Sequence, residues 1–156
     1  MAYTGITTYL WFDGRAQEAA DFYTSLFPGS TLGSASYYQA DAQQKAGEVL
    51  VIEFELLGQR FAILNGGPQF PQTEAVSLQV SCETQEDVDR LWDALIANGG
   101  EAGRCGWCKD RFGVSWQVIP QGLGELLSDP DPEVSQYAFT QMMTMGKIDL
   151  AQMRRS

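Results

Sequence analysis

The stretch that decides the fold lies in the later part of the chain: Cys105-Gly106-Trp107-Cys108-Lys109-Asp110-Arg111-Phe112-Gly113-Val114-Ser115-Trp116-Gln117-Val118-Ile119-Pro120. It contains a glycine-bearing turn followed by residues of alternating character, which is typical of a strand with one buried face. Trp116 and Val118 are predicted to pack inward, which places Ser115, Gln117 and Ile119 on the opposite face. That face is predicted to be uncharged at its centre.

Composition and charge limit the class of protein. The chain has 156 residues, 44% hydrophobic and 19% charged, enough for one well-buried domain or two small modules sharing one sheet. A net charge of −10 and a pI near 4.3 oppose binding to nucleic acid or to an anionic membrane. No apolar stretch approaches the ~20 residues needed to span a bilayer, and the start lacks a signal pattern. We therefore expect a cytoplasmic protein with no nucleic-acid or membrane partner.

The first half is predicted to contain a strand, a helix and three more strands. Apolar residues at helical spacing from Ala16 to Phe27 predict the helix, which Pro28-Gly29 ends. The strands are expected over residues 6–12, 31–38, 49–57 and 60–64, with a hairpin across residues 57–59.

The same order begins again in the second half. A strand is expected over residues 75–82, with one apolar face and one polar face: Val76, Leu78, Val80 and Cys82 against Ser77, Gln79 and Ser81. Thr84 and Asp87 resemble a capping box at the start of a helix that ends at residues 98–100. After Pro120, Asp131-Pro132 is expected to begin a further helix that packs on the protein. Its methionines are expected to pack in the core or at a dimer interface, or alternatively to contact a ligand.

Three cysteines in a chain without an export signal argue against a disulfide framework. Cys82 is expected to be buried at a strand end. Cys105 and Cys108 form a Cys-x-x-Cys pair, which we interpret as two ordinary thiols near a pocket mouth. Redox or metal chemistry is the alternative, although the chain has no histidine to complete a zinc site.

Three further motifs make the chain similar to a known family: Leu10-Trp11-Phe12-Asp13-Gly14, Leu64-Asn65-Gly66-Gly67-Pro68 and Met142-Met143-Thr144-Met145-Gly146-Lys147-Ile148-Asp149-Leu150. With the opening stretch, they resemble the PhnB-like family of the vicinal-oxygen-chelate (glyoxalase/bleomycin resistance protein/dihydroxybiphenyl dioxygenase) superfamily. The resemblance implies an α+β fold of two βαβββ modules around a cleft, with a C-terminal helical extension. It implies one domain over residues 1–156, with modules at about 3–67 and 74–120 and a tail at about 121–156. It also implies a homodimer.

The resemblance also bears on cofactors. Metal-dependent relatives take ligands from the first and last strands of each module, where this chain has Thr8 or its neighbour, Ala62 or its neighbour, Ser77 and Gln117. Divalent metals are held by imidazole or carboxylate groups, so we expect no bound metal or other cofactor, with a divalent metal as the alternative. Some members are labelled 3-demethylubiquinone-9 3-methyltransferases. The turn Asp13-Gly14-Arg15 has a single glycine, whereas a Rossmann-type methyltransferase needs a glycine-rich loop.

Seven residues are predicted to contact a ligand: Thr8, Glu53, Asn65, Ser77, Gln79, Trp107 and Gln117. Glu53, with Glu55, lies on the polar side of its strand, which faces the cleft or, alternatively, solvent. Asn65 and Trp107 fall in loops at strand ends, where an amide and an indole can contact a ligand. The alternative is that the neighbouring glycines only make a turn and Trp107 only shields an edge.

These features favour a small-molecule-binding protein that uses the cleft without a metal. One alternative is a lyase, isomerase or dioxygenase-like enzyme with an atypical centre at Gln117 and Glu53. The other is a structural or partner-binding dimer whose cleft is filled by Tyr137 or Met142 of its own tail. The sequence assigns no catalytic residue.

Overall fold

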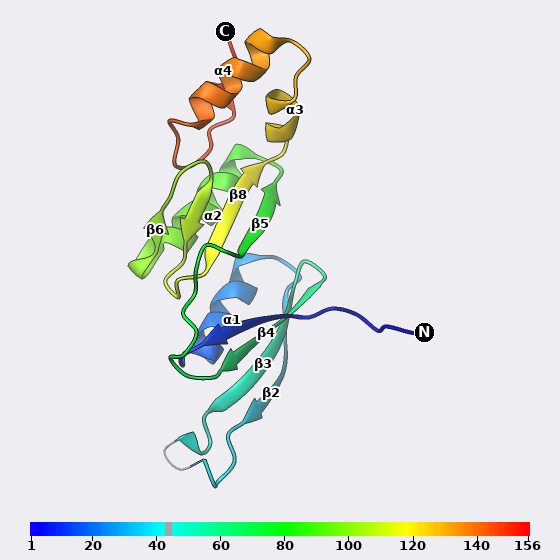
Figure 1. The fold of residues 1–156 in the computed structure, drawn as a ribbon, viewed down its shortest axis with the longest axis vertical. Coiled ribbons are helices and arrows are strands. Elements are labelled where there is room, and N and C mark those ends of the chain that lie inside the picture. Colours follow the sequence, from blue (N-terminus) through cyan, green and yellow to red (C-terminus); the bar gives the residue numbers. More distant parts are fainter. Residues whose placement is uncertain (43–44) are drawn as a thin grey trace. The chain divides into compact units, whose positions relative to one another are not determined.

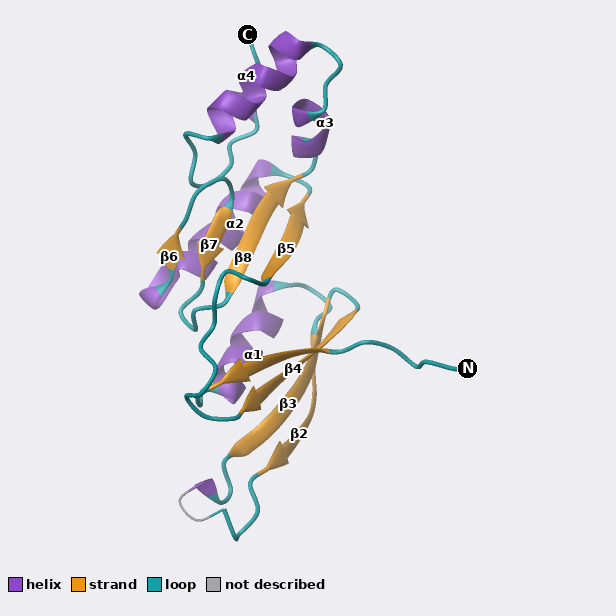
Figure 2. Ribbon diagram, viewed as in Figure 1, coloured by secondary structure: helices purple, strands orange, loops and turns teal. Residues whose placement is uncertain are grey.

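A computed structural model describes residues 1–42 and 45–156 of the chain. The chain forms two compact units, Met1–Gln72 and Thr73–Ser156. Each unit contains a four-stranded sheet with a helix packed on one face (Figures 1 and 2). The predicted α+β class, with two similar modules and a C-terminal helical extension, is confirmed.

The first unit follows the predicted order. Its elements are β1 (Thr8–Phe12), α1 (Ala16–Leu26), β2 (Thr31–Tyr37), β3 (Val49–Leu56) and β4 (Gln59–Asn65). The sheet order is β1-β4-β3-β2, with β1 parallel to β4 and the other neighbours antiparallel. The helical spacing seen in the sequence buries one stripe of α1: Ala16, Ala19, Ala20 and Tyr23. The opposite face of this sheet is its open face.

A tight hairpin joins β3 to β4. Leu57 and Gly58 have φ values of 49° and 83°, and two left-handed residues make the turn whose twist matches that of paired strands. In β3, Phe54 is buried on the α1 side, while Glu53 and Glu55 are exposed on the open face. The predicted hairpin and alternation are confirmed.

A bulge interrupts β2. Its register with β3 shifts between Leu32 and Ala35. A Cβ atom on Gly33 would lie 3.0 Å from the carbonyl oxygen of Glu53, so the close approach of the two strands favours glycine here.

The second unit repeats this topology. Its elements are β5 (Ser77–Cys82), α2 (Gln85–Ile96), β6 (Glu101–Ala102), β7 (Trp107–Lys109), β8 (Ser115–Pro120), α3 (Leu123–Leu127) and α4 (Pro132–Met142). Short 3₁₀ turns occur at Ala97–Gly99 and Ala151–Met153. The sheet order β5-β8-β7-β6 corresponds strand for strand to that of the first unit. Across residues 1–42 and 45–156, no helix combines the length and apolar character that a membrane crossing requires.

The helix starts in this unit follow the predicted chemistry. Thr84 Oγ1 accepts a hydrogen bond from the backbone N–H of Asp87 at 3.1 Å and donates one to its carboxylate at 2.7 Å. Asp131 accepts a hydrogen bond from the N–H of Glu133 at 2.9 Å and caps α4. Both capping residues satisfy donors that a helix start leaves without intrahelical partners.

Two local predictions in the second unit are wrong. β5 begins at Ser77, so Val76 precedes the strand and is 66% exposed instead of packed inward. Trp107 is the first residue of β7, paired with Gln117, and does not lie in a loop. The reason is that Cys105 and Gly106, with φ values of 55° and 84°, complete the turn before Trp107.

A buried aspartate organises the turn between β7 and β8. Asp110 is only 2% exposed. Its carboxylate accepts hydrogen bonds from the N–H groups of Phe112 (2.8 Å) and Val114 (3.1 Å) and from the indole of Trp116 (2.8 Å). These three donors compensate the loss of hydration of the buried charge. The buried role of Asp110 is not apparent from the sequence, because a charged residue three positions before Gly113 resembles an ordinary surface turn.

The C-terminal extension packs on the second unit, as predicted. The N–H groups of Cys105 and Gly106 donate to the carbonyl oxygens of Met145 (2.9 Å) and Gly146 (2.8 Å). The side chain of Gln85 donates to the carbonyl oxygen of Ile148 at 2.9 Å. An apolar cluster holds the extension together: Leu123, Ala138, Ile148 and Met153 are buried in it, and Ile119, Leu126, Leu127, Met142, Met145 and Leu150 pack around them.

Candidate functional site

The open face of the second sheet, opposite α2, carries a row of side chains across three strands. Gln79 of β5 pairs with Gln117 of β8, which pairs with Trp107 of β7. Gln117 Nε2 donates a hydrogen bond to Ser77 Oγ at 2.9 Å. Trp116 and Val118, on either side of Gln117, are buried on the α2 side. The strand alternation predicted from the sequence therefore brings Ser77, Gln79 and Gln117 together, with Trp107 beside them.

A pocket of about 550 Å³ adjoins this row, and we refer to it as the ligand pocket. Its lining comes from the sheet, the preceding turn and the C-terminal extension: Gln79, Ser81, Cys105, Trp107, Gln117, Ile119, Pro120, Gln121, Gly122, Leu123, Gly124, Leu127 and Met142. The lining contains amides, a hydroxyl, a thiol and apolar groups, and no carboxylate, ammonium or guanidinium group. It suits an uncharged molecular surface.

The extension forms a wall of the ligand pocket. Gly122 has a φ of 90°, and this left-handed residue turns the chain from β8 into α3. Leu123 and Leu127 of α3 and Met142 of α4 then line the pocket. Tyr137 is 36% exposed and does not line it. Met142 lies in the wall of this pocket.

The three thiols have different surroundings, and all three are free. Cys105 lines the ligand pocket, with its Sγ 3.6 Å from the carbonyl oxygen of Met142 and 3.9 Å from Met143 Sδ. Cys108 is 3% exposed, and burial, together with the charge of Asp110, raises its pKa to about 12. Burial also raises the pKa of Cys82, which lies at the end of β5 as predicted. Reactive Cys-x-x-Cys pairs depend on a lowered thiol pKa, so the raised pKa of Cys108 favours the ordinary-thiol interpretation.

In the first unit, a corresponding row crosses the open face. Tyr9 of β1 pairs with Ala62 of β4, which pairs with Glu53 of β3. Thr8 lies two residues before the buried Leu10 and therefore shares its α1 side. Glu53 Oε2 accepts a hydrogen bond from Ser34 Oγ at 3.0 Å.

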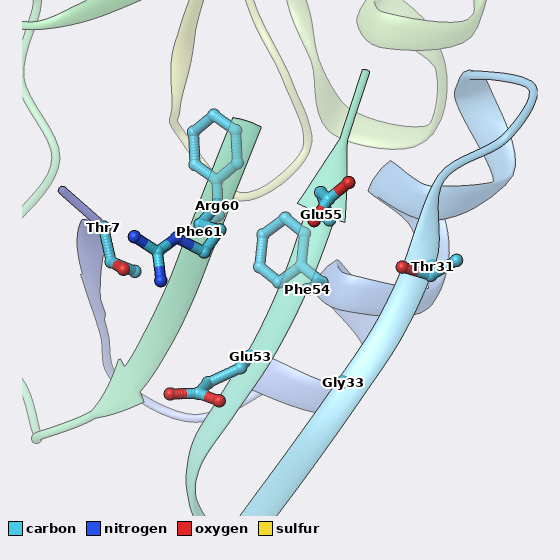
Figure 3. A pocket seen from close by; sticks show the side chains of 8 residues that line it. All are labelled: Thr7, Thr31, Gly33, Glu53, Phe54, Glu55, Arg60 and Phe61. Atoms are coloured by element: carbon cyan, nitrogen blue, oxygen red, sulfur yellow. The ribbon is translucent and has the colours of Figure 1, made fainter. Parts of the chain in front are cut away.

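Glu53 also borders a pocket of about 210 Å³ (Figure 3). The lining comes from β2, β3, β4 and the segment before β1: Thr7, Thr31, Gly33, Glu53, Phe54, Glu55, Arg60 and Phe61. The two carboxylates and the guanidinium make this pocket polar and charged, in contrast to the ligand pocket of the second unit.

Asn65 is the last residue of β4, so the prediction that it lies in a loop is wrong, and its contacts are mainly structural. Its Nδ2 donates to the carbonyl oxygen of Val49 at 3.0 Å, and its own carbonyl oxygen accepts from the hydroxyl of Tyr38 at 2.5 Å. Its Oδ1 is buried and makes no hydrogen bond within the described part of the chain.

The glycines after Asn65 bring two sequence motifs together. The N–H groups of Gly66 and Gly67 donate to the carbonyl oxygen of Phe12, at 2.9 and 3.3 Å, and Trp11 Nε1 donates to the carbonyl oxygen of Gly67 at 2.8 Å. A Cβ atom on Gly66 would lie 2.3 Å from the Trp11 ring, so only glycine fits without a shift. These contacts support a structural role for the Asn65-Gly66-Gly67-Pro68 motif.

The positions that correspond to metal ligands in the superfamily do not suit a divalent metal. The register places the phenol of Tyr9 and the methyl group of Ala62 on the first open face, and the hydroxyl of Ser77 and the amide of Gln117 on the second. Over residues 1–42 and 45–156, no three acidic or cysteine side chains cluster so that they could hold a metal, and the chain has no histidine. Neither the pair Tyr9 and Ala62 nor the pair Ser77 and Gln117 supplies the imidazole or carboxylate groups that such metals prefer.

Comparison with known proteins identifies the family. The family model for 3-demethylubiquinone-9 3-methyltransferase matches residues 4–119. The solved structure of a PhnB protein from Bacillus cereus is 37% identical, with a TM-score of 0.69 over 75% of this chain and 99% of that one. The chain belongs to the PhnB-like family. A protein from Pseudomonas aeruginosa shares the PhnB-like fold at 23% identity and a TM-score of 0.61, covering 76% of this chain and 98% of that one.

More distant solved structures share this fold. The fosfomycin resistance protein FosX from Listeria monocytogenes is 14% identical, with a TM-score of 0.53 over 76% of this chain and 94% of that one. A search of curated proteins finds no match. The family match ends at residue 119, so the wall that α3 and α4 add to the ligand pocket lies outside the matched region.

Proposed function

We propose that this PhnB-like protein binds a small organic molecule with an uncharged, partly apolar body in the ligand pocket of the second unit, without a metal ion. The observation that carries the proposal is the pocket of about 550 Å³ with amides along one side and an apolar wall. Its volume is in the range of about 300–1,000 Å³ typical of ligand sites. A charged group placed against this lining would lose hydration without gaining a counter-charge.

The contacts of Gln117 suggest how a ligand is oriented. Its Nε2 is engaged with Ser77 Oγ, which leaves Oε1 as an acceptor for a ligand N–H or O–H group. Gln79 lies beside it with a second amide, and Trp107 supplies an aromatic surface for a planar ligand. Ile119 and Leu123 contribute the apolar side of the site.

The relatives give independent support for this class of function. One solved structure with this fold is a glyoxalase/bleomycin resistance protein from Albidiferax ferrireducens, and another is the fosfomycin resistance protein FosX. Their names connect the fold with small organic molecules. Since both are 14% identical to this chain, they support a small organic molecule as the kind of ligand, and neither its identity nor its charge follows from them.

The test is a screen of uncharged fragments against ¹⁵N-labelled protein, with the indole N–H of Trp107 as the reporter. Gln117→Leu keeps a similar volume and removes the amide, so it should abolish the shifts caused by hits. Thr31→Ala, in the pocket of the first unit, is the matched control and should leave them unchanged. A broad library without a hit, or hits that bind Gln117→Leu equally well, would overturn the proposal.

The metal-free part of the proposal has its own test. Elemental analysis follows incubation of the purified protein with Mn, Fe, Co, Ni or Zn and desalting. We expect no retained metal. About one metal ion per chain, lost in Glu53→Ala or Gln117→Ala, would instead favour the enzyme with an atypical centre.

A further inference from the structure

A second, charged row crosses the open face of the second sheet beside the ligand pocket. Glu101 of β6 pairs with Lys109 of β7, Lys109 pairs with Ser115 of β8, and Ser115 pairs with Ser77 of β5. Each strand therefore contributes one polar side chain at the same level of the sheet. This row lies two residues along each strand from the row that contains Gln117.

A separate pocket of about 200 Å³ lies at this row, and we refer to it as the charged pocket. It is lined by Glu74, Glu101, Ala102, Gly103, Trp107, Cys108, Lys109 and Ser115. Trp107 is the one residue that both linings share. The rest of the charged pocket is independent of the proposed ligand pocket.

Ser115 has a hydroxyl group without a hydrogen-bond partner in this pocket. The residue is 1% exposed, and its Oγ makes no hydrogen bond within the described residues. Leaving a buried hydroxyl unsatisfied is unfavourable, and such groups in native proteins commonly meet a ligand or water. Lys109, its register partner, supplies further donors from the next strand.

The position beside Lys109 is already occupied by a carboxylate of the chain itself. Glu74 forms an ion pair with Lys109 Nζ from the segment before β5, and the Glu74 side chain is 61% exposed. Their hydrogen bond is the main reason why the pKa of Glu74 lies below its ordinary value and the pKa of Lys109 above it. Both groups therefore stay charged at neutral pH.

We propose that Lys109 and Ser115 form a subsite for the carboxylate of a small organic acid, and that Glu74 holds the lysine of this subsite in the free protein. A carboxylate oxygen accepts from the ammonium of Lys109 and from the hydroxyl of Ser115, which is the acceptor that Ser115 lacks. Glu74 is displaced easily, because water screens an exposed ion pair.

The other charge that faces this pocket opposes the ligand. Glu101 lies across from Lys109, and its charge also favours the protonated lysine. With Glu74 displaced, an incoming carboxylate meets one ammonium and one further carboxylate. The subsite therefore binds anions weakly in the free protein and more strongly when either glutamate is neutralised.

The test uses benzoate as the probe and benzamide as its uncharged counterpart, monitored by ¹H–¹⁵N spectra and by the Trp107 indole signal. Glu74→Gln should tighten benzoate binding several-fold, because the internal competitor is lost. Lys109→Gln should weaken it about tenfold, and Ser115→Ala should weaken it less. Lys147→Gln is the matched control, since Lys147 also forms a surface ion pair, with Asp89, in the same unit.

The outcomes separate this proposal from the proposed function. Chemical shift changes caused by benzamide test the ligand pocket, because benzamide carries no charge, and they should persist in Lys109→Gln. Only the changes caused by benzoate test the carboxylate subsite. Tighter benzoate binding in Glu74→Gln, with a loss in Lys109→Gln and no change in Lys147→Gln, supports the subsite. Benzoate binding that is absent, or that is unaffected by both Glu74→Gln and Lys109→Gln, overturns it. Glu74 is on the surface, so its variant is expected to fold normally.

Discussion

The indole of Trp116 donates a hydrogen bond to the carboxylate of Asp110 at 2.8 Å, and both side chains are buried. The other oxygen of the same carboxylate receives two backbone N–H groups of the intervening turn. One charged group thereby connects the turn before β8 to a fully buried tryptophan in the core of the second unit. The position of Gln117, the next residue along β8, depends on this connection.

Asp110→Ala is expected to lower the free energy of unfolding by about 3 kcal/mol, because the buried indole and backbone donors lose their acceptor. Urea unfolding followed by tryptophan fluorescence measures the change. Asp41→Ala is the control: this residue is exposed in a loop, and its replacement should change the unfolding free energy by less than about 0.5 kcal/mol. Equal stabilities of the two variants would contradict the structural role of Asp110.

Ile148→Ala should also destabilise the protein, by about 2–5 kcal/mol, because Ile148 is fully buried where the extension meets the sheet. The cavity would loosen the wall formed by α3 and α4, so the amide protons of residues 123–127 should exchange faster with solvent. Ile6→Ala provides the comparison, since Ile6 is 89% exposed. An Ile148→Ala variant as stable as the wild type would show that the extension contributes little to the fold.

Stability should fall in alkaline solution because of Cys108. The folded protein keeps the thiol proton until the pH approaches about 12, whereas the unfolded chain releases it near the ordinary value of 9.0. Between these values the unfolded state binds fewer protons, so rising pH favours unfolding. Cys108→Ala should show a smaller loss of stability over this range in urea unfolding at stepped pH. If the unfolding free energies of the wild type and Cys108→Ala fell equally with pH, Cys108 would not be the cause.

Alkylation should distinguish the three cysteines. In the native protein at pH 8, iodoacetamide should modify Cys105 first, because Cys82 and Cys108 are buried with raised pKa values. Mass spectrometry of tryptic peptides gives the rate at each site. All three should react at similar rates in urea, and early labelling of Cys108 in the native protein would contradict the structure.

Most of the fold could be predicted from the sequence because it depends on local periodicity. The apolar stripe of α1 from Ala16 to Tyr23 and the alternation around Gln117 each specify which face is buried. The errors occurred where one residue decides a boundary. Val76 is apolar but precedes the first ladder pair of β5, and Trp107 begins a strand directly after the turn made by the left-handed residues Cys105 and Gly106.

The candidate site could be predicted only in part. Gln79 and Gln117 follow from strand alternation, since adjacent parallel strands place them on the same face. The contribution of Leu123 could not be predicted, and that of Met142 was only an alternative, because both depend on how the extension folds back over the sheet. The pairing of Lys109 with Glu74 likewise joins residues far apart in the sequence, and no periodic pattern marks such a contact.

The bulge in β2 has a consequence for how the protein behaves at high concentration. β2 is an edge strand seven residues long, and a regular edge of that length is a template on which a strand from another molecule can add. The register shift at Gly33 breaks the even spacing of its backbone donors and acceptors. Aggregation by strand addition is thereby disfavoured at the longer edge of the first sheet, without any need for a covering element.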